Sequence, residues 1–90
     1  MLKITIHSEA QLMRIELEGR LTGPWVRELD RCWKAVAAAP HGEILVNLSE
    51  VPFIDDDGKM LLSRMWREGA RLHAVGCLTK CIVEEITKEG

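Results

Sequence analysis

The segment EILVNL at residues 43–48 constrains the fold more than any other part of the chain. Ile44, Leu45 and Val46 are consecutive and apolar, a run that is typical of a strand buried on both faces. Such a strand needs cover on each side, either from helices on both faces or from a helix on one face and a hairpin on the other. We therefore predict a domain in which helices and strands pack together.

Two segments with a different pattern precede this strand. In LKITIH (residues 2–7) and QLMRIELEGR (residues 11–20), apolar and polar residues alternate. Alternation of this kind predicts strands with one buried and one wet face. The link SEA between them is short, so we expect the two strands to form a hairpin.

Helical spacing dominates most of the remaining sequence. Apolar residues recur along one face of a helix in residues 25–39 and again from about 58 to 72. HAVGCL (residues 73–78) is typical of a short strand, and residues 79–89 predict a last helix capped by Thr79.

The predicted elements follow the order β-β-α-β-α-β-α. The hairpin and a right-handed parallel β-α-β unit would share one mixed sheet packed with helices. The chain has 90 residues, enough for one modest core. We therefore predict a single small α/β domain across residues 1–90.

Charge and composition exclude several classes of function. A net charge of −2 argues against a nucleic-acid partner, which requires an excess of lysine and arginine. No apolar stretch approaches the roughly 20 residues of a membrane-spanning helix, and no signal-peptide pattern opens the chain, so we expect a cytoplasmic protein. Cys32, Cys77 and Cys81 are odd in number and unevenly spaced, which indicates reduced, packed thiols and neither a metal nor a redox site.

Three consecutive carboxylates, Asp55, Asp56 and Asp57, repel one another and need a physical explanation. They fall where the helix at residues 58–72 should begin. A helix N-terminus offers free N–H groups and about half a positive charge, which stabilises a carboxylate there. One of the three is therefore explained as a helix cap, but a cap does not account for all three.

A metal site is the second explanation. Phe53 breaks the alternate spacing of an EF-hand loop. Asp55, Asp57 and Gly58 resemble the D-x-D-G core of phosphohydrolases of the haloacid dehalogenase type. Lys59 replaces the usual threonine, however, and the chain is too short for the remaining ligands of that enzyme. No serine, threonine or cysteine has a visible base beside it. We predict no enzyme, no metal and no cofactor.

The third explanation is an interaction surface, which a family resemblance supports. ILVNLSEVPFIDDDGKMLL (residues 44–62) resembles the signature of the STAS domain, the fold of bacterial anti-sigma factor antagonists. IELEGRLTGPWVREL (residues 15–29) resembles the family's second strand, its turn and its first helix. GARLHAVGCLTKCIVEEI (residues 69–86) is similar to the later part of the fold. The family usually continues with another strand and a terminal helix, and we expect this chain to lack both.

The resemblance implies a function. In family antagonists, the residue before the glycine is a serine that an anti-sigma factor with kinase activity phosphorylates, and the unphosphorylated form captures that factor. Asp57 occupies this position here, and it has no hydroxyl. Its charge of −1 is below the roughly −1.5 to −2 of phosphoserine. Asp57 therefore either mimics the released state or belongs to a surface with constitutive affinity.

We accordingly expect a non-catalytic regulator that binds an anti-sigma factor of the serine-kinase type without the phosphorylation switch. The alternatives are a STAS subunit of another assembly, such as a stressosome or a lipid-transport complex, and the metal-dependent phosphohydrolase. An uncovered edge or apolar face also leaves a homodimer open. Loops at the carboxyl ends of parallel strands gather at one edge, which brings Trp25 into the predicted site. The predicted partner-binding residues are Asp55, Asp56, Asp57, Gly58, Lys59 and Trp25.

Overall fold

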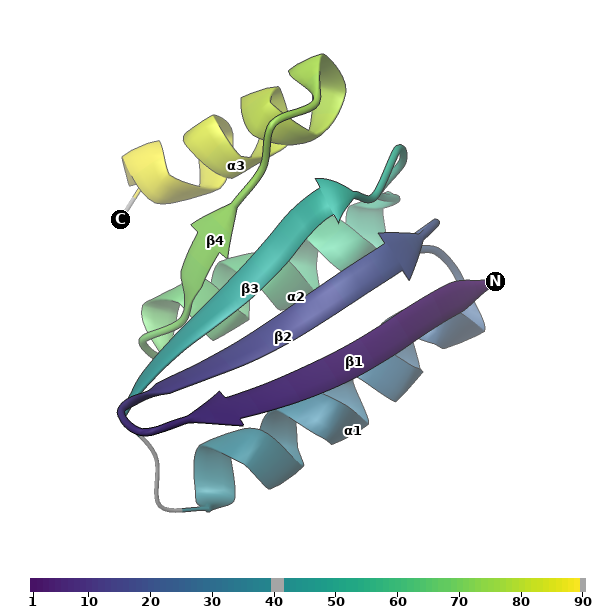
Figure 1. Cartoon of the computed structure of the whole chain (residues 1–90). Coiled ribbons are helices and arrows are strands. Elements are labelled where there is room, and N and C mark those ends of the chain that lie inside the picture. The colour runs from purple at the N-terminus through teal and green to yellow at the C-terminus, as the bar shows by residue number, and fades with distance from the viewer. Residues whose placement is uncertain (40–41, 90) are drawn as a thin grey trace.

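A computed structural model of the chain describes residues 1–39 and 42–89. Its elements follow the predicted order, and Figure 1 shows their arrangement. The four-stranded sheet has the order β1-β2-β3-β4, in which β1 pairs antiparallel with β2 and the other pairs are parallel. The predicted mixed sheet, a hairpin joined to a parallel β-α-β unit, is confirmed. The elements are β1 (Leu2–Glu9), β2 (Leu12–Gly19), α1 (Pro24–Ala38), β3 (Glu43–Glu50), α2 (Asp56–Arg67), β4 (Arg71–His73) and α3 (Cys77–Glu89).

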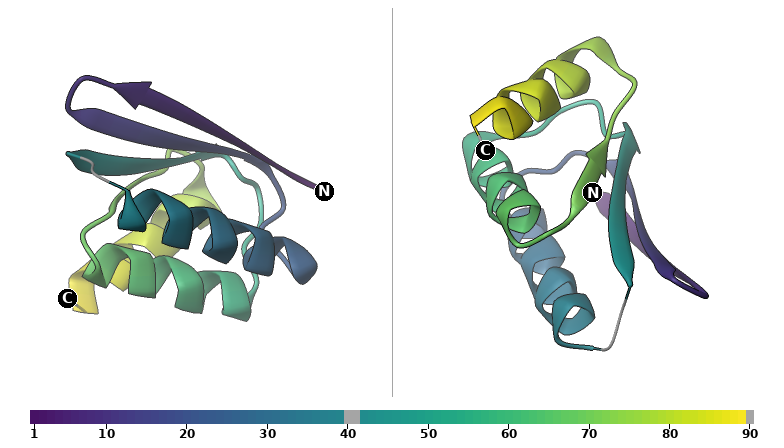
Figure 2. Two further views of the ribbon diagram at one scale, coloured as in Figure 1. Left: turned by 90° about the horizontal axis from the view of Figure 1, so that it is seen from below. Right: turned by 90° about the vertical axis from the view of Figure 1, so that its left-hand side faces the viewer.

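All three helices lie on the same side of the sheet (Figure 2). The prediction that β3 is buried on both faces is therefore wrong. Ile44, Val46 and Leu48 point to the helices and are buried, whereas Leu45 and Asn47 on the open face are only partly buried. The neighbouring strands β2 and β4 flank β3, so an apolar residue on its open face is partly covered without a second helical layer.

The core lies between the sheet and the helices. Alternate residues of β2 and β3 point into the core from the sheet, and one face of α1 and one face of α2 pack against them from the helical layer. Trp33 is 2% exposed and is the largest of the fully enclosed side chains. Burial of such side chains contributes about 1.5–3 kcal/mol each to folding. The buried residues of α1 are Val26, Leu29, Trp33 and Val36, and those of α2 are Gly58, Leu61, Leu62 and Met65.

Helix α2 ends at Arg67, five residues before the predicted boundary at residue 72. Gly69 has a φ of 113°, and its N–H donates to the carbonyl of Trp66 at 3.1 Å. The N–H of Ala70 donates to the carbonyl of Met65 at 3.0 Å. These two bonds form a Schellman motif, in which a glycine with positive φ stops the helix. Leu72, which the helical pattern included, lies in β4 instead.

The start of the last helix also differs from the prediction. β4 covers only Arg71–His73, and α3 begins at Cys77, two residues before the expected cap. Thr79 lies inside α3, 3% exposed, and its hydroxyl donates a hydrogen bond of 2.5 Å to the carbonyl of Val51. The predicted role of Thr79 as a cap is therefore wrong, and its side chain ties α3 to the loop after β3.

Candidate functional site

The loops that follow β2 and β3 lie side by side at one edge of the sheet. Leu21 and Ile54 form an isolated parallel bridge between these loops. The N–H of Leu21 donates to the carbonyl of Phe53 at 3.0 Å, and the N–H of Asp55 donates to the carbonyl of Leu21 at 3.2 Å. Because β2 and β3 are parallel, their carboxyl ends meet at this edge, as the sequence predicted. The starts of α1 and α2 are thereby held next to each other.

Asp55 connects the two helix starts through its side chain. Its Oδ1 accepts a hydrogen bond of 2.8 Å from the N–H of Gly58, which caps α2. Its Oδ2 accepts a hydrogen bond of 3.0 Å from the N–H of Gly23, the residue before α1. The prediction that one carboxylate of the triplet is a helix cap is confirmed. Both oxygens of Asp55 are engaged inside the domain, so its first role is structural.

Gly58 is a buried residue within the first turn of α2. A Cβ at this position would lie 2.9 Å from the carbonyl oxygen of Leu21 and 2.8 Å from Cγ2 of Ile54. No side chain fits so close to the backbone. Glycine is therefore needed to seat α2 on the neighbouring loop, and it shapes the site from within.

The other predicted site residues surround the contacts that Asp55 and Gly58 make with the loop after β2. Asp56 and Asp57 lie in the first turn of α2 and are exposed. Lys59 is partly exposed, and Trp25 packs its partly buried side chain against the core near the start of α1. The structure thus brings the predicted residues to one edge of the molecule, with Asp56 and Asp57 as its most accessible carboxylates.

Two exposed apolar residues at this edge were missed from the sequence. Phe53 in the loop before α2 is 50% exposed, and Met60 in the first turns of α2 is 70% exposed. The exposure of Met60 was predictable in principle, because Met60 lies next to Leu61 in the sequence but not on the buried face of α2 to which Leu61 belongs. Large exposed apolar side chains beside charged ones are typical of protein-binding surfaces.

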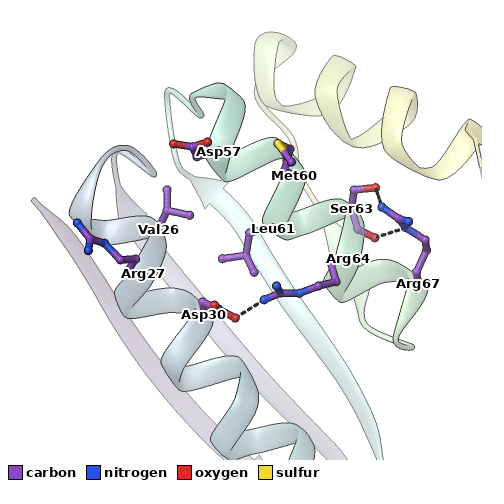
Figure 3. Close-up of a pocket in the computed structure, with 9 residues that line it drawn as sticks. All are labelled: Val26, Arg27, Asp30, Asp57, Met60, Leu61, Ser63, Arg64 and Arg67. Carbon is purple, nitrogen blue, oxygen red and sulfur yellow. Dashed lines mark hydrogen bonds and ion pairs between the residues drawn. The ribbon is translucent and has the colours of Figure 1, made fainter.

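A groove of about 470 Å³ runs between α1 and α2 and reaches Asp57 (Figure 3). Val26 and Leu61, both largely buried, form its apolar part. Met60 stands at its rim. The residues that line it are Val26, Arg27, Asp30, Asp57, Met60, Leu61, Ser63, Arg64 and Arg67.

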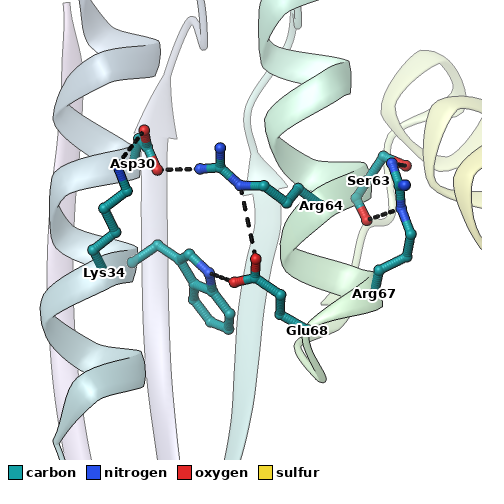
Figure 4. A network of polar contacts seen from close by, with 7 residues as sticks. Asp30, Lys34, Ser63, Arg64, Arg67 and Glu68 are labelled. Carbon is teal, nitrogen blue, oxygen red and sulfur yellow. Dashed lines mark hydrogen bonds and ion pairs between the residues drawn. The ribbon is translucent and has the colours of Figure 1, made fainter.

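A polar network crosses from α1 to α2 along this groove (Figure 4). Asp30 of α1 pairs with Arg64 of α2 and also with Lys34 at 3.5 Å. Arg64 approaches Glu68 at 4.0 Å, and Glu68 accepts a hydrogen bond of 2.7 Å from the indole Nε1 of Trp33. The Asp30–Arg64 pair and the Trp33–Glu68 hydrogen bond thus connect α1 and α2 across the groove.

In the described part of the chain, neither a metal-binding cluster nor the arrangement of the cysteines points to a catalytic site. Among residues 1–39 and 42–89, no group of three or more histidine, cysteine, aspartate or glutamate residues could hold a metal ion. Cys32 is partly buried, but Cys81 is exposed, so the prediction that the thiols are packed is wrong for Cys81. The side chain of Cys77 lies outside the described part. No helix in the described ranges has the length and apolar character required to cross a bilayer.

Comparison with solved structures identifies the fold. The chain superimposes with a TM-score of 0.86 and 16% identity on an anti-sigma factor antagonist from Mycobacterium paratuberculosis, covering 99% of this chain and 80% of the other. It also matches two structures of Mglu, with TM-scores of 0.62 and 0.59 and identities of 18% and 20%. These matches cover 80% and 77% of this chain but only 19% and 22% of Mglu. No protein-family model and no curated protein matches the sequence.

The chain therefore has the fold of an anti-sigma factor antagonist, which is the STAS fold predicted from the sequence. The element order and the mixed sheet agree with that neighbour. An identity of 16% carries the fold alone, so the function rests on the site.

Proposed function

We propose that this chain is a non-catalytic regulator of the anti-sigma factor antagonist type, which binds a protein partner through the exposed start of α2. The observation that carries the proposal is the arrangement around Asp55 and Gly58. These two residues fix the helix start from inside, while Asp56, Asp57 and Met60 remain accessible on its surface. A rigid, mixed apolar and acidic surface suits recognition of another protein.

The first partner that we propose is an anti-sigma factor of the serine-kinase type in the bacterial cytoplasm. The fold is that of an antagonist, and the family resemblance aligns Asp57 with the phosphorylated serine. Asp57 lies in the first turn of α2, where the helix dipole stabilises its negative charge. The side chain has no hydroxyl to accept a phosphate, so binding would not be controlled by phosphorylation at this position.

Affinity capture tests the proposal. The wild-type chain and the Asp57→Ser variant are immobilised, exposed to a lysate of the source organism, and the retained proteins are identified by mass spectrometry. Asp56→Ser serves as the control, because it removes an equally exposed carboxylate from the neighbouring position. We expect a kinase-type anti-sigma factor on the wild-type or Asp57→Ser columns.

The outcomes separate the alternatives. Capture by wild type and Asp57→Ser alike would support an antagonist without a switch. Capture by Asp57→Ser alone would mean that Asp57 holds the natural protein in the released state. If no column retains such a kinase and all retain another assembly, the chain is a STAS subunit of that assembly and the proposed partner is wrong.

A further inference from the structure

The groove between α1 and α2 has an apolar floor and an excess of positive charge. Three arginines and two aspartates line it. Asp30 is already paired with both Lys34 and Arg64, which neutralises much of the charge in the middle of the groove. The arginines at its sides, Arg27 from α1 and Arg67 from α2, decide what chemistry the groove attracts.

Arg27 and Arg67 have no carboxylate within ion-pair distance among the residues that the structure describes. Arg67 is nevertheless held in position. Its Nη2 donates to the hydroxyl of Ser63 at 3.2 Å and its Nε to the Ser63 carbonyl at 3.4 Å. A guanidinium that is oriented but not paired with an acid retains donors for a carboxylate from another molecule.

The apolar part of the groove adds a second requirement. Met60 is 70% exposed at the rim, above the largely buried Val26 and Leu61. An occupant must cover Met60 with an apolar side chain to remove it from water. The combination of an apolar anchor and carboxylates describes an amphipathic acidic segment, since neither a simple anion nor a basic segment satisfies both parts.

We infer that this groove receives an acidic amphipathic segment of the protein partner, with apolar side chains on Met60 and carboxylates on Arg27 and Arg67. The inference rests on the proposed function and specifies the partner's chemistry. Asp57 at one end of the groove and Arg67 at the other are separated by about 15 Å along α2. Arg27 lies near the start of α1, at the Asp57 end of the groove (Figure 3). The segment therefore carries carboxylates on both sides of its apolar part, one towards Arg27 and one towards Arg67.

Short synthetic peptides test the inference without a natural partner. One peptide carries two leucines with a glutamate on each side, and two matched peptides carry glutamine or lysine in place of the glutamates. Each is titrated into ¹⁵N-labelled protein, and amide chemical shifts are followed by NMR. We expect saturable shifts in residues 26–30 and 57–67 with the acidic peptide, weaker ones with the glutamine peptide and the weakest with the lysine peptide.

Arginine variants provide the internal control. The Arg27→Gln/Arg67→Gln double variant should bind the acidic peptide about three- to tenfold more weakly, as expected for the loss of two exposed ion pairs. Arg31→Gln should leave its affinity unchanged, because Arg31 is an exposed arginine of α1 that pairs with Glu28 and does not line the groove. Thermal unfolding of each variant confirms that the fold is intact.

Several results would overturn the inference. These are equal shifts with all three peptides, no shifts at millimolar peptide, shifts centred outside the groove, or the same response to free glutamate as to the acidic peptide. Self-association of the protein through this groove, seen as concentration-dependent shifts without peptide, would assign the groove to a second copy and also contradict the inference. Failure of the proposed function is distinguishable, because it would appear in the capture experiment while the peptides still bound.

Discussion

The backbone N–H of Gly23 donates a hydrogen bond of 3.0 Å to the carboxylate of Asp55, which lies 32 residues later in the chain. This bond joins the starts of α1 and α2 through one side chain. It explains why an aspartate occupies a position that another small polar cap could fill. The same carboxylate caps α2 through Gly58, so the site's shape depends on Asp55 more than on either of the other two aspartates.

Replacing Asp55 by alanine should lower the free energy of unfolding by about 2 kcal/mol, because the variant loses a helix cap and a second hydrogen bond to a charged acceptor. Urea denaturation followed by circular dichroism measures the loss. Asp56→Ala is the matched control and should change stability by no more than about 0.5 kcal/mol, since Asp56 is exposed. Equal losses in the two variants would contradict the structural role of Asp55.

Gly58→Ala should be destabilising by about 1–3 kcal/mol, although alanine favours helices by about 1 kcal/mol over glycine. The reason is the 2.9 Å approach of the new Cβ to the Leu21 carbonyl oxygen, a backbone atom that cannot rotate away. Thermal unfolding compares this variant with Gly76→Ala, where no atom lies within 4 Å of the added Cβ. A stabilised Gly58→Ala variant would show that α2 is not seated as described.

Thr79→Val should cost about 1–3 kcal/mol, because the shape of the side chain is retained while the buried carbonyl of Val51 loses its hydrogen bond. Chemical denaturation provides the measurement. Thr87→Val is the control, since the hydroxyl of Thr87 bonds only to carbonyls of its own helix at Val83 and Glu84. The account of Thr79 as the tether of α3 fails if both variants lose the same stability.

Millimolar Mg²⁺ or Ca²⁺ should not raise the melting temperature. A ligand that binds only the folded state stabilises it by mass action, so a metal site at Asp55–Asp57 would become visible in a thermal titration. The Asp55 oxygens are occupied by Gly58 and Gly23, which leaves no free pair of aligned carboxylates with Asp57. A saturable increase that disappears in Asp57→Asn would revive the phosphohydrolase alternative.

Hydrophobic periodicity predicted the element types and their order because α1, α2 and β2 each bury one face. The buried face predicted for β1 is wrong at Ile6, which is 44% exposed, and only Leu2 of this strand is buried. The periodicity gave wrong boundaries for the end of α2 and the start of α3. Gly69 falls within the helix predicted for residues 58–72, whereas its positive φ ends α2. Residues 73–78 were predicted to be a strand, but β4 ends at His73 and α3 already begins at Cys77.

The site was predictable in part. A helix cap within the triplet and the proximity of the two loops follow from local chemistry and from parallel strands. The bond from Asp55 to Gly23 and the groove between α1 and α2 depend on tertiary contacts, which spacing along the chain does not encode. Met60 could be recognised as a surface residue only once the inner stripe of α2 was located.

The central claim is that the exposed start of α2 is the partner-binding surface. Its most direct test is the affinity of the captured partner for the wild-type chain, for Met60→Glu and for the control Gln11→Glu, measured by isothermal titration calorimetry. Gln11 is exposed at the hairpin turn, beside the start of β3 at the opposite end of the sheet, and its substitution adds the same charge. We predict at least a tenfold loss for Met60→Glu and no change for Gln11→Glu. Unchanged affinity for Met60→Glu would contradict the claim.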